Sequence, residues 1–444
     1  MTDKLTVGFI SLGCAKNQIN TEHMIAAVKN AGYNVTGEPE KSDVTVINTC
    51  GFIEDAKKEA LDTIFEVAAL KKENKLQKII VCGCLSERYS DNIADELYEV
   101  DGFVGVGSFQ NIVEVIDRVM SGERVCDFGD LENIQLEGER YVISPEFSVY
   151  LKIADGCSNC CSYCAIPSIR GRFHSRPMEN IIEEAKLLAK NGAKELIVIA
   201  QDTSNYGIDI YGKRRLAELL RELCKVEGIE WVRIMYLYPD KITDELIEVI
   251  KTEDKIVKYI EMPVQHAAGS MLARMNRPGD KASLLELVHK LRREIPNVIL
   301  RTTLMVGFPG ETDSEFEQLC EFVKEAEFDK LGVFTFSEEE GTPAFDMQDK
   351  IEEDIKDRRA ETIELLQSEI VLKKQDELLN KTVEVIVEGF DRIAECWFGR
   401  SYMEAPDIDG KIFFTSNDAI DAGDIISVKI TECMDFELIG EKVN

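Results

Sequence analysis

The chain has 444 residues, 83 of them acidic and 52 basic, which gives a net charge of −31. Its hydrophobic content of 44% is that of an ordinary globular protein, and the length allows two or three domains. So large a negative charge argues against a broad nucleic-acid footprint, because phosphate neutralisation needs clustered Lys and Arg. A basic partner fits better.

The sequence contains no stretch of about 18 uncharged apolar residues, and its first apolar run is too short for a signal peptide. We therefore expect a cytoplasmic protein with no membrane partner. The thirteen cysteines are an odd number, and several lie too close together in the sequence for a disulfide framework. Metal binding in a reducing compartment is the better interpretation.

Residues 1–125 alternate strand and helix patterns, which predicts right-handed βαβ units and a parallel sheet. Cys14, Cys50 and Cys84 each fall at the end of an apolar strand, where a parallel sheet gathers its ligands. We expect these three thiols to converge on one edge, although three unrelated buried cysteines would give the same pattern. Cys82 lies inside the apolar run IIVCG and is predicted to be a core residue, but it competes with Cys84 as a ligand.

Residues 126–145 are polar and irregular, as is typical of a linker. Between 147 and about 345 we count six βα units, beginning with SVYLKIADG and ending with KLGVFTFS. Six units fall short of a closed eightfold barrel, so we predict a partial barrel with an open side and its chemistry at the carboxyl ends of the strands.

The loop after the first of these strands reads CSNCCSYC. Cys157, Cys161 and Cys164 have the C-x3-C-x2-C spacing that lets one loop wrap three thiolates around a 4Fe-4S cube and leaves one iron without a protein ligand. A zinc site completed by Cys160 is the alternative, but adjacent thiolates would strain a tetrahedral site.

Polar residues at other strand ends are candidate cofactor contacts: Gln201, Asp202, Gln265 and Arg301. A strand-end Gln or Asp can equally be a helix cap. Arg170, Arg172 and Arg176 follow the cysteine loop, either as a solvated basic turn or as groups that grip a cofactor or an acidic substrate group.

Residues 351–380 are predicted to form a long amphipathic helix, or two. The strand patterns that follow predict a small antiparallel barrel. From Glu377 onward the chain has 15 acidic and 6 basic residues. Oligonucleotide-binding barrels are usually basic, so this barrel is poorly suited to RNA.

Eight segments spread over nearly the whole chain resemble the methylthiotransferase family of radical S-adenosylmethionine (radical SAM) enzymes: SLGCAKNQINTE, VINTCGFI, VCGCLSERY, ADGCSNCCSYCAIP, AQDTSNYG, MPVQHAAGSML, VGFPGET and EEGTPA. The resemblance implies an α/β multidomain protein with a parallel-sheet cluster-binding domain (1–125), a partial (β/α)6 radical SAM barrel (143–375) and a TRAM barrel (377–444). It also implies that Cys14, Cys50 and Cys84 bind one 4Fe-4S cluster and that Cys157, Cys161 and Cys164 bind the cluster that chelates SAM.

Within this family, AQDTSNYG, MYLYPDKIT and the acidic C-terminal barrel are similar to the branch that modifies a ribosomal protein. The implied reaction uses two SAM molecules to add a methylthio group to the β-carbon of an aspartate in small-subunit ribosomal protein twelve, with help from an electron donor and a sulfur donor. The alternative is methylthiolation of adenosine in tRNA, which uses the same cysteines. A pure iron-sulfur assembly or electron-transfer protein would need no SAM contacts.

Overall fold

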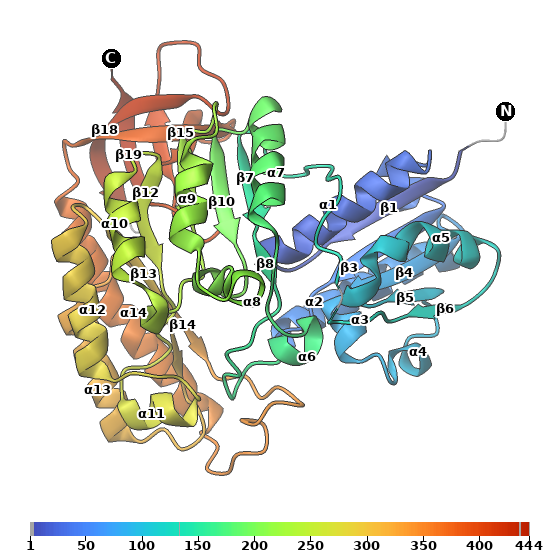
Figure 1. The fold of residues 1–444 in the computed structure, drawn as a ribbon, viewed down its shortest axis with the longest axis horizontal. Coiled ribbons are helices and arrows are strands. Elements are labelled where there is room, and N and C mark those ends of the chain that lie inside the picture. The colour runs from blue at the N-terminus through green and yellow to red at the C-terminus, as the bar shows by residue number, and fades with distance from the viewer. Residues whose placement is uncertain (1–3, 133, 435–436, 444) are drawn as a thin grey trace.

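The computed structural model describes residues 4–132, 134–434 and 437–443, which form three domains (Figure 1). The N-terminal domain has a parallel sheet of order β2-β1-β3-β4-β5-β6. Its central strand β3 is the buried run VTVINT, as expected for a strand covered on both faces. The strands are β1 (Thr6–Ser11), β2 (Asn34–Thr36), β3 (Val44–Thr49), β4 (Lys78–Gly83), β5 (Gly102–Val104) and β6 (Val125–Asp127). The helices are α1 (Ala15–Asn30), α2 (Glu54–Lys72), α3 (Cys84–Arg88), α4 (Ile93–Glu96) and α5 (Ile112–Met120).

The chain runs from β1 outward to β2 and then returns to the other side of β1 as β3. The order of strands therefore reverses between β1 and β3. In open α/β sheets this reversal leaves a crevice at the carboxyl ends of the two strands, where ligands bind. The predicted parallel sheet is confirmed, and Cys14 and Cys50 follow the two strands that flank the crevice.

The central domain contains six parallel strands in the order β14-β13-β12-β11-β10-β7, an open sheet with β7 and β14 at its edges. This confirms the predicted partial barrel of six βα units. The strands are β7 (Ser148–Lys152), β10 (Glu195–Ile199), β11 (Trp231–Ile234), β12 (Ile256–Glu261), β13 (Ile299–Val306) and β14 (Lys330–Thr335), and a short ladder pairs β8 (Ala154–Asp155) with β9 (His174–Ser175). The helices are α6 (Ile166–Arg170), α7 (Met178–Lys190), α8 (Ile208–Tyr211), α9 (Leu216–Cys224), α10 (Asp244–Thr252), α11 (Gly269–Arg274), α12 (Lys281–Glu294), α13 (Asp313–Ala326) and α14 (Glu353–Asp376).

Several of these helices begin at side-chain caps. Asp280 before α12 and Thr312 before α13 each form a capping box with the residue three positions on. The segment expected to hold one or two helices at 351–380 is the single helix α14, which leads to the C-terminal domain. None of the helices in the described part of the chain is long and apolar enough to cross a membrane.

The C-terminal domain is a closed five-stranded barrel in the order β15-β16-β17-β19-β18. It confirms the predicted small barrel, with one pairing, β17 with β19, that is parallel because the chain crosses over before its last hairpin. Its strands are β15 (Thr382–Asp391), β16 (Cys396–Arg400), β17 (Ile412–Thr415), β18 (Ile425–Met434) and β19 (Glu437–Lys442).

The inner face of the central sheet is covered by the other two domains. One buried cluster joins Ile19 of α1 to Ile197 and Tyr259 of the sheet and to Ile386 and Ala405 of the C-terminal domain. In Figure 1 the N-terminal domain lies beside the β7 edge, and the C-terminal barrel lies at the end of the sheet remote from α6. The carboxyl ends of the central strands therefore stay available for a site.

Candidate metal centres

The structure brings together the three loops that carry the N-terminal thiol set (Cys14, Cys50 and Cys84). Gly13 has a φ of 85°, and a Cβ there would lie 2.7 Å from the Cβ of Cys50. A Cβ on Gly51 would lie 2.7 Å from the Cα of Leu85, in the first turn of helix α3, which begins at Cys84. Only glycine permits these approaches, so the sequences GC and CG around the thiols are what let the loops meet. The expected convergence on one sheet edge is confirmed.

Two cations lie against the N-terminal thiol set. Desolvation would raise the pKa of Cys14, but Lys16 and Arg170 lower it overall. Arg170 also donates to the Cys84 sulfur at 3.4 Å. Burial and the neighbouring Cys84 raise the pKa of Cys50 to about 11. Cations beside a cluster of thiols favour the thiolate form, which is the form that binds metal.

The loop thiol set (Cys157, Cys161 and Cys164) follows β8 at the carboxyl end of the central sheet. Asn159 donates to the Cys157 sulfur at 3.2 Å, and Arg277 approaches the Cys161 sulfur at 3.7 Å. Such N–H groups aimed at sulfur are the usual surroundings of iron-sulfur ligands, whose charge they help to stabilise.

The three thiols of the loop set lie close enough together to affect one another's pKa. Burial, with Cys161 and Cys157 nearby, raises the pKa of Cys164 to about 12. Within residues 4–132, 134–434 and 437–443, no three Cys, His, Asp or Glu side chains converge tightly enough to hold a single metal ion. A 4Fe-4S cube carries its thiolates on separate irons and spaces them more widely than one zinc ion does. Each set supplies three cysteine thiols, which is the donor chemistry of a 4Fe-4S cluster with one iron left free of protein ligands.

One strand-end segment contacts Cys161 of the loop thiol set and Lys16, which lies two residues from Cys14. Tyr238 places its hydroxyl 3.5 Å from the Cys161 sulfur. Two residues earlier, the ring of Tyr236 lies under the Lys16 ammonium, 3.0 Å from nitrogen to ring centroid. Cys14 is also close enough to raise the pKa of Tyr236, after burial and Glu261. The two thiol sets therefore face the same mouth of the central sheet.

The predicted cofactor contacts differ in how their side chains are used. Gln201 donates to Asp155 at 2.7 Å, while its buried side-chain oxygen has no partner among the described residues. Asp202 is buried and accepts from Lys241 and Asn159. That Gln201 and Asp202 bind SAM stays a prediction.

Arg301 lies on β13, and Gln265 lies beyond the end of β12, where it forms an isolated bridge with Leu304 of β13. Gln265 has a φ of 70°, a left-handed conformation that is costly for a residue with a side chain and is often found at functional sites. Arg301 lies within 3.4 Å of both Glu261 and Asp409, so its guanidinium joins the sheet to the C-terminal domain. For these two residues also, cofactor binding stays a prediction.

Two of the three arginines after the cysteine loop, Arg170 and Arg176, are buried and are not part of a solvated turn. Arg170 is 1% exposed and donates to both carboxylate oxygens of Asp155, at 3.2 and 3.0 Å. Arg176 is paired with Glu137 and Glu184. The expected role of Arg170 and Arg176 in gripping a substrate carboxylate is not supported, because acidic side chains already occupy both guanidinium groups. Arg172 is exposed.

The two doubtful cysteines lie apart from the thiol sets they might have joined. Cys82 is buried against the sulfur of Met24, 3.9 Å away, as expected for a core residue. Cys160 is exposed, with a φ of 54° and its thiol 3.7 Å from the Ser158 carbonyl oxygen. Neither position indicates a ligand.

Sequence reasoning missed Lys16, Asn159, Tyr238 and Arg277. Lys16 and Asn159 each lie two residues from a thiol, so their nearness in sequence was a usable signal. Tyr238 and Arg277 come from other βα units, and only the folded sheet brings them to the loop.

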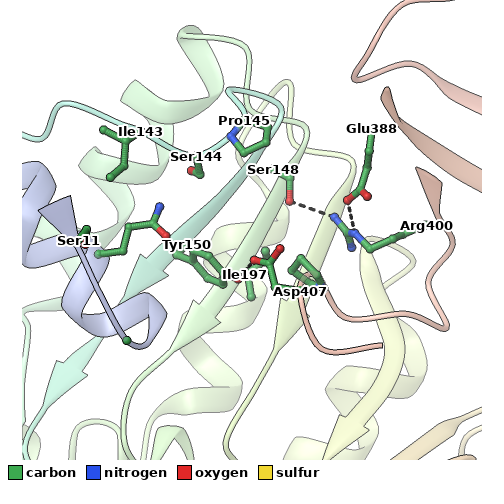
Figure 2. A pocket seen from close by; sticks show the side chains of 13 residues that line it. Ser11, Ile143, Ser144, Pro145, Ser148, Tyr150, Ile197, Glu388, Arg400 and Asp407 are labelled. Carbon is green, nitrogen blue, oxygen red and sulfur yellow. Dashed lines mark hydrogen bonds and ion pairs between the residues drawn. The ribbon is translucent and has the colours of Figure 1, made fainter. Parts of the chain in front are cut away.

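A cavity of about 260 Å³ lies where the three domains meet (Figure 2). Gly13 and Gln18 of the N-terminal domain line it, together with Tyr150 of β7 and Asp407 of the C-terminal domain. Tyr150 donates to Asp407 at 3.2 Å. The cavity is thus a product of domain docking and reaches the loop that holds Cys14.

Comparison with known proteins agrees with this architecture. The model of the radical SAM superfamily matches residues 151–323, that of uncharacterized protein family UPF0004 matches residues 6–105, and that of the TRAM domain matches residues 381–443. Among solved structures, the radical S-adenosylmethionine methyltransferase TsrM from Kitasatospora setae, with cobalamin and a 4Fe-4S cluster bound, has a TM-score of 0.57 at 13% identity, covering 77% of each chain. The fold and the site thus define a radical SAM enzyme.

Relatives at higher identity narrow the class. Ribosomal protein uS12 methylthiotransferase RimO of Thermoanaerobacter sp. (strain X514) is 47% identical over 98% of this chain and 99% of its own. The protein of the same name from Clostridioides difficile (strain 630) is 45% identical over 98% of each chain. The chain therefore belongs to the RimO family of radical SAM methylthiotransferases.

Proposed function

We propose that this protein adds a methylthio group to the β-carbon of an aspartate in ribosomal protein uS12, small-subunit ribosomal protein twelve. It would do so with two 4Fe-4S clusters and two molecules of SAM. The N-terminal thiol set would hold one cluster and the loop thiol set the other. The relatives' names supply the substrate, since they cover almost the whole chain at 43–48% identity.

The observation that carries the proposal is the segment from Tyr236 to Tyr238. It touches Lys16 beside the N-terminal thiol set and Cys161 of the loop thiol set. Methylthiolation needs a carbon to be activated at one centre and to receive sulfur at the other, so both centres must reach one substrate atom. Two thiol sets at one mouth meet that requirement, whereas a protein that only stores or passes clusters has no need of it.

A cluster with SAM at the loop thiol set would supply radical chemistry that can remove hydrogen from an unactivated carbon, which acid-base side chains cannot do. Side chains of this protein would stabilise the cluster thiolates and contact the bound SAM. Asn159 and Arg277 would stabilise the charge on Cys157 and Cys161. The unpartnered side-chain oxygen of Gln201 offers an acceptor to a donor on bound SAM.

Arg170 would do the same for the N-terminal thiol set while Asp155 holds it in place. Asp155 also accepts from Gln201, so one buried carboxylate connects the surroundings of both sets. Burial would raise its pKa, but Lys152 and Arg170 hold it well below the usual range, and it stays ionised. Electron and sulfur donors would be separate partners, and a cytoplasmic location stays a prediction.

Charge supports a protein rather than tRNA as the substrate. The chain's net charge of −31 repels polyphosphate over a Debye length of about 8 Å at physiological salt and attracts basic ribosomal proteins. The C-terminal barrel does not counter this, because acidic residues outnumber basic ones in it.

The test is anaerobic reconstitution of the protein with iron, sulfide, SAM and a reductant, followed by mass spectrometry of purified uS12. We expect the mass of one methylthio group, less one hydrogen, on a single aspartate. A parallel reaction with tRNA, digested to nucleosides, should show no methylthioadenosine. Modified tRNA with unmodified uS12 would replace the proposal with the tRNA alternative.

A further inference from the structure

The buried ammonium of Lys16 is the feature that the proposed chemistry leaves unexplained. Lys16 lies in the first turn of α1 and is only 6% exposed. Its ammonium nitrogen lies over the face of the Tyr236 ring, 3.0 Å from the ring centroid. Within the described part of the chain, this nitrogen makes neither a hydrogen bond nor an ion pair. A buried charge without a bonded acceptor is costly, and buried charges are normally paired.

The other cations around the two thiol sets are already in use. Arg170 is held by Asp155, and Lys241 by Asp202. Arg277 donates to the carbonyl oxygen of Pro263 and lies over the ring of Tyr238. Among these four buried cations, Lys16 is the one whose nitrogen has no acceptor in the described part of the chain.

The nearest carboxylate, Glu261, is not free to pair with Lys16. It accepts from the backbone N–H of Tyr236 at 2.6 Å and faces Arg301 at 3.4 Å. Thr203 fixes Tyr236 from the other side by donating to its carbonyl oxygen at 3.0 Å. These bonds hold Tyr236 at a φ of 63°, a strained conformation for a tyrosine, with its ring under Lys16. The surrounding structure thus positions the ammonium and leaves it without an acceptor.

The position of this ammonium matters because it lies between the two thiol sets. Lys16 is two residues from Cys14, and the segment under it reaches Cys161 through Tyr238. A carbon that is activated at one set and receives sulfur at the other must lie in the same region. A protein of net charge −31 repels an entering carboxylate, so a local cation is needed to receive it.

We infer that the Lys16 ammonium binds the side-chain carboxylate of the substrate aspartate. The inference rests on the proposed function and names the residue that recognises the substrate side chain. The β-carbon of aspartate is bonded directly to the carboxyl carbon. A charge-assisted hydrogen bond that holds the carboxylate therefore also positions the reacting carbon, which is one bond away. Lys16 takes the place of Arg170 and Arg176, which already have acidic partners, as the carboxylate-binding cation.

The test compares the wild type with K16M and K16R in the reconstituted reaction. K29M is the matched control, because Lys29 lies on the same helix and also stacks on a tyrosine, Tyr141, at 3.6 Å, but is exposed at the other end. Because Lys16 also lowers the pKa of Cys14, iron content is measured in all four proteins and each rate is expressed per reconstituted cluster. K29M should match the wild type in iron content and in SAM cleavage without uS12. K16Q, neutral but polar, serves in place of K16M if K16M does not hold its iron.

With uS12 present, we expect K16M to lower kcat/KM about 100-fold, K16R to lower it less, and K29M to leave it unchanged. We also expect less methylthiolated product per SAM cleaved in K16M, because a poorly held carbon misses the radical. With uS12 carrying asparagine at the target position, wild type and K16M should react at the same low rate, since no carboxylate is present.

Equal product per SAM cleaved in K16M and wild type would overturn the inference. So would an equal fold-loss in K16M on the aspartate and asparagine substrates, which would show a structural role only. If the wild type cleaves SAM but never modifies uS12, the proposed function itself has failed, and that outcome is separate from either of these.

Discussion

Replacing Glu195 by Gln should loosen the docking of the C-terminal barrel on the central sheet. Glu195 opens β10 and is fully buried. One carboxylate oxygen accepts from Arg233 at 2.8 Å, and the other accepts from Arg400 at 2.8 Å and from Ser148 at 2.8 Å. Arg400, which also pairs with Glu388 in Figure 2, belongs to the C-terminal domain. With a neutral Gln at position 195, Arg233 would have no carboxylate partner among the described residues, and Arg400 would keep only Glu388.

The expected loss of stability in E195Q can be worked out from the pKa of Glu195. Burial alone would raise its pKa, but Arg400 and Arg233 lower it from the ordinary 4.5 to about 2. Because each tenfold change in acidity corresponds to about 1.4 kcal/mol, the loss in E195Q should be on the order of 3 kcal/mol. Removal of one partner from other buried ion pairs costs a similar 3–5 kcal/mol or so.

Hydrogen exchange measures this loss locally, which suits a three-domain protein that need not unfold in one step. Amides of β16 and the loop after it should exchange about 100-fold faster in E195Q at neutral pH. The control is E222Q. It removes the exposed ion pair between Glu222 of α9 and Lys225, and it should change the protection of the amides little. Equal protection in E195Q and E222Q would refute the reasoning.

The pH dependence gives a second check. Because the pKa of Glu195 is lower in the folded protein, its contribution is fully present above about pH 4.5 and is lost as the pH falls toward 2. The difference between wild type and E195Q should therefore shrink over that window. If the difference in protection between wild type and E195Q stays constant down to pH 3, the ionisation of Glu195 is not what stabilises the docking.

The remaining predictions concern the metal centres, acid stability and substrate capture. Reconstituted protein should hold about eight irons per chain, and a value near four together with bound zinc would contradict two clusters. Alanine at the loop thiol set should abolish reductive SAM cleavage, whereas alanine at the N-terminal thiol set should leave cleavage intact and stop methylthiolation; loss of cleavage in both would show that the roles are not divided. Burial and the charges of Lys152 and Arg140 lower the pKa of His23 to about 4. Its contribution to stability should therefore fall as the pH drops from 6.5 toward 4, and thermal unfolding of H23N should show a smaller decrease in that range than the wild type. Capture of uS12 should slow as salt rises, and a rate independent of salt would argue against charge steering.

The sequence by itself determined the features that depend on local pattern. Apolar runs in the sequence predicted the six strands of the central sheet and the three strands that precede Cys14, Cys50 and Cys84. A strand buried in a parallel sheet reads as a short continuous apolar run, which is a local pattern. The spacing of Cys157, Cys161 and Cys164 is a property of one loop and needs no tertiary contact to be recognised. The acidic C-terminal barrel likewise follows from composition.

Only the tertiary structure decided which charged groups are free. Arg170, Arg176 and Arg301 looked available in the sequence, but acids from distant segments occupy all three. Nothing in the sequence distinguished Lys16. The position of its ammonium over the Tyr236 ring, without an acceptor in the described part of the chain, depends on how α1 docks on the sheet. The acidic partner lies 15 positions away for Arg170, 39 for Arg176 and 108 for Arg301, so the pairing is set by tertiary packing and leaves no periodic signal in the sequence.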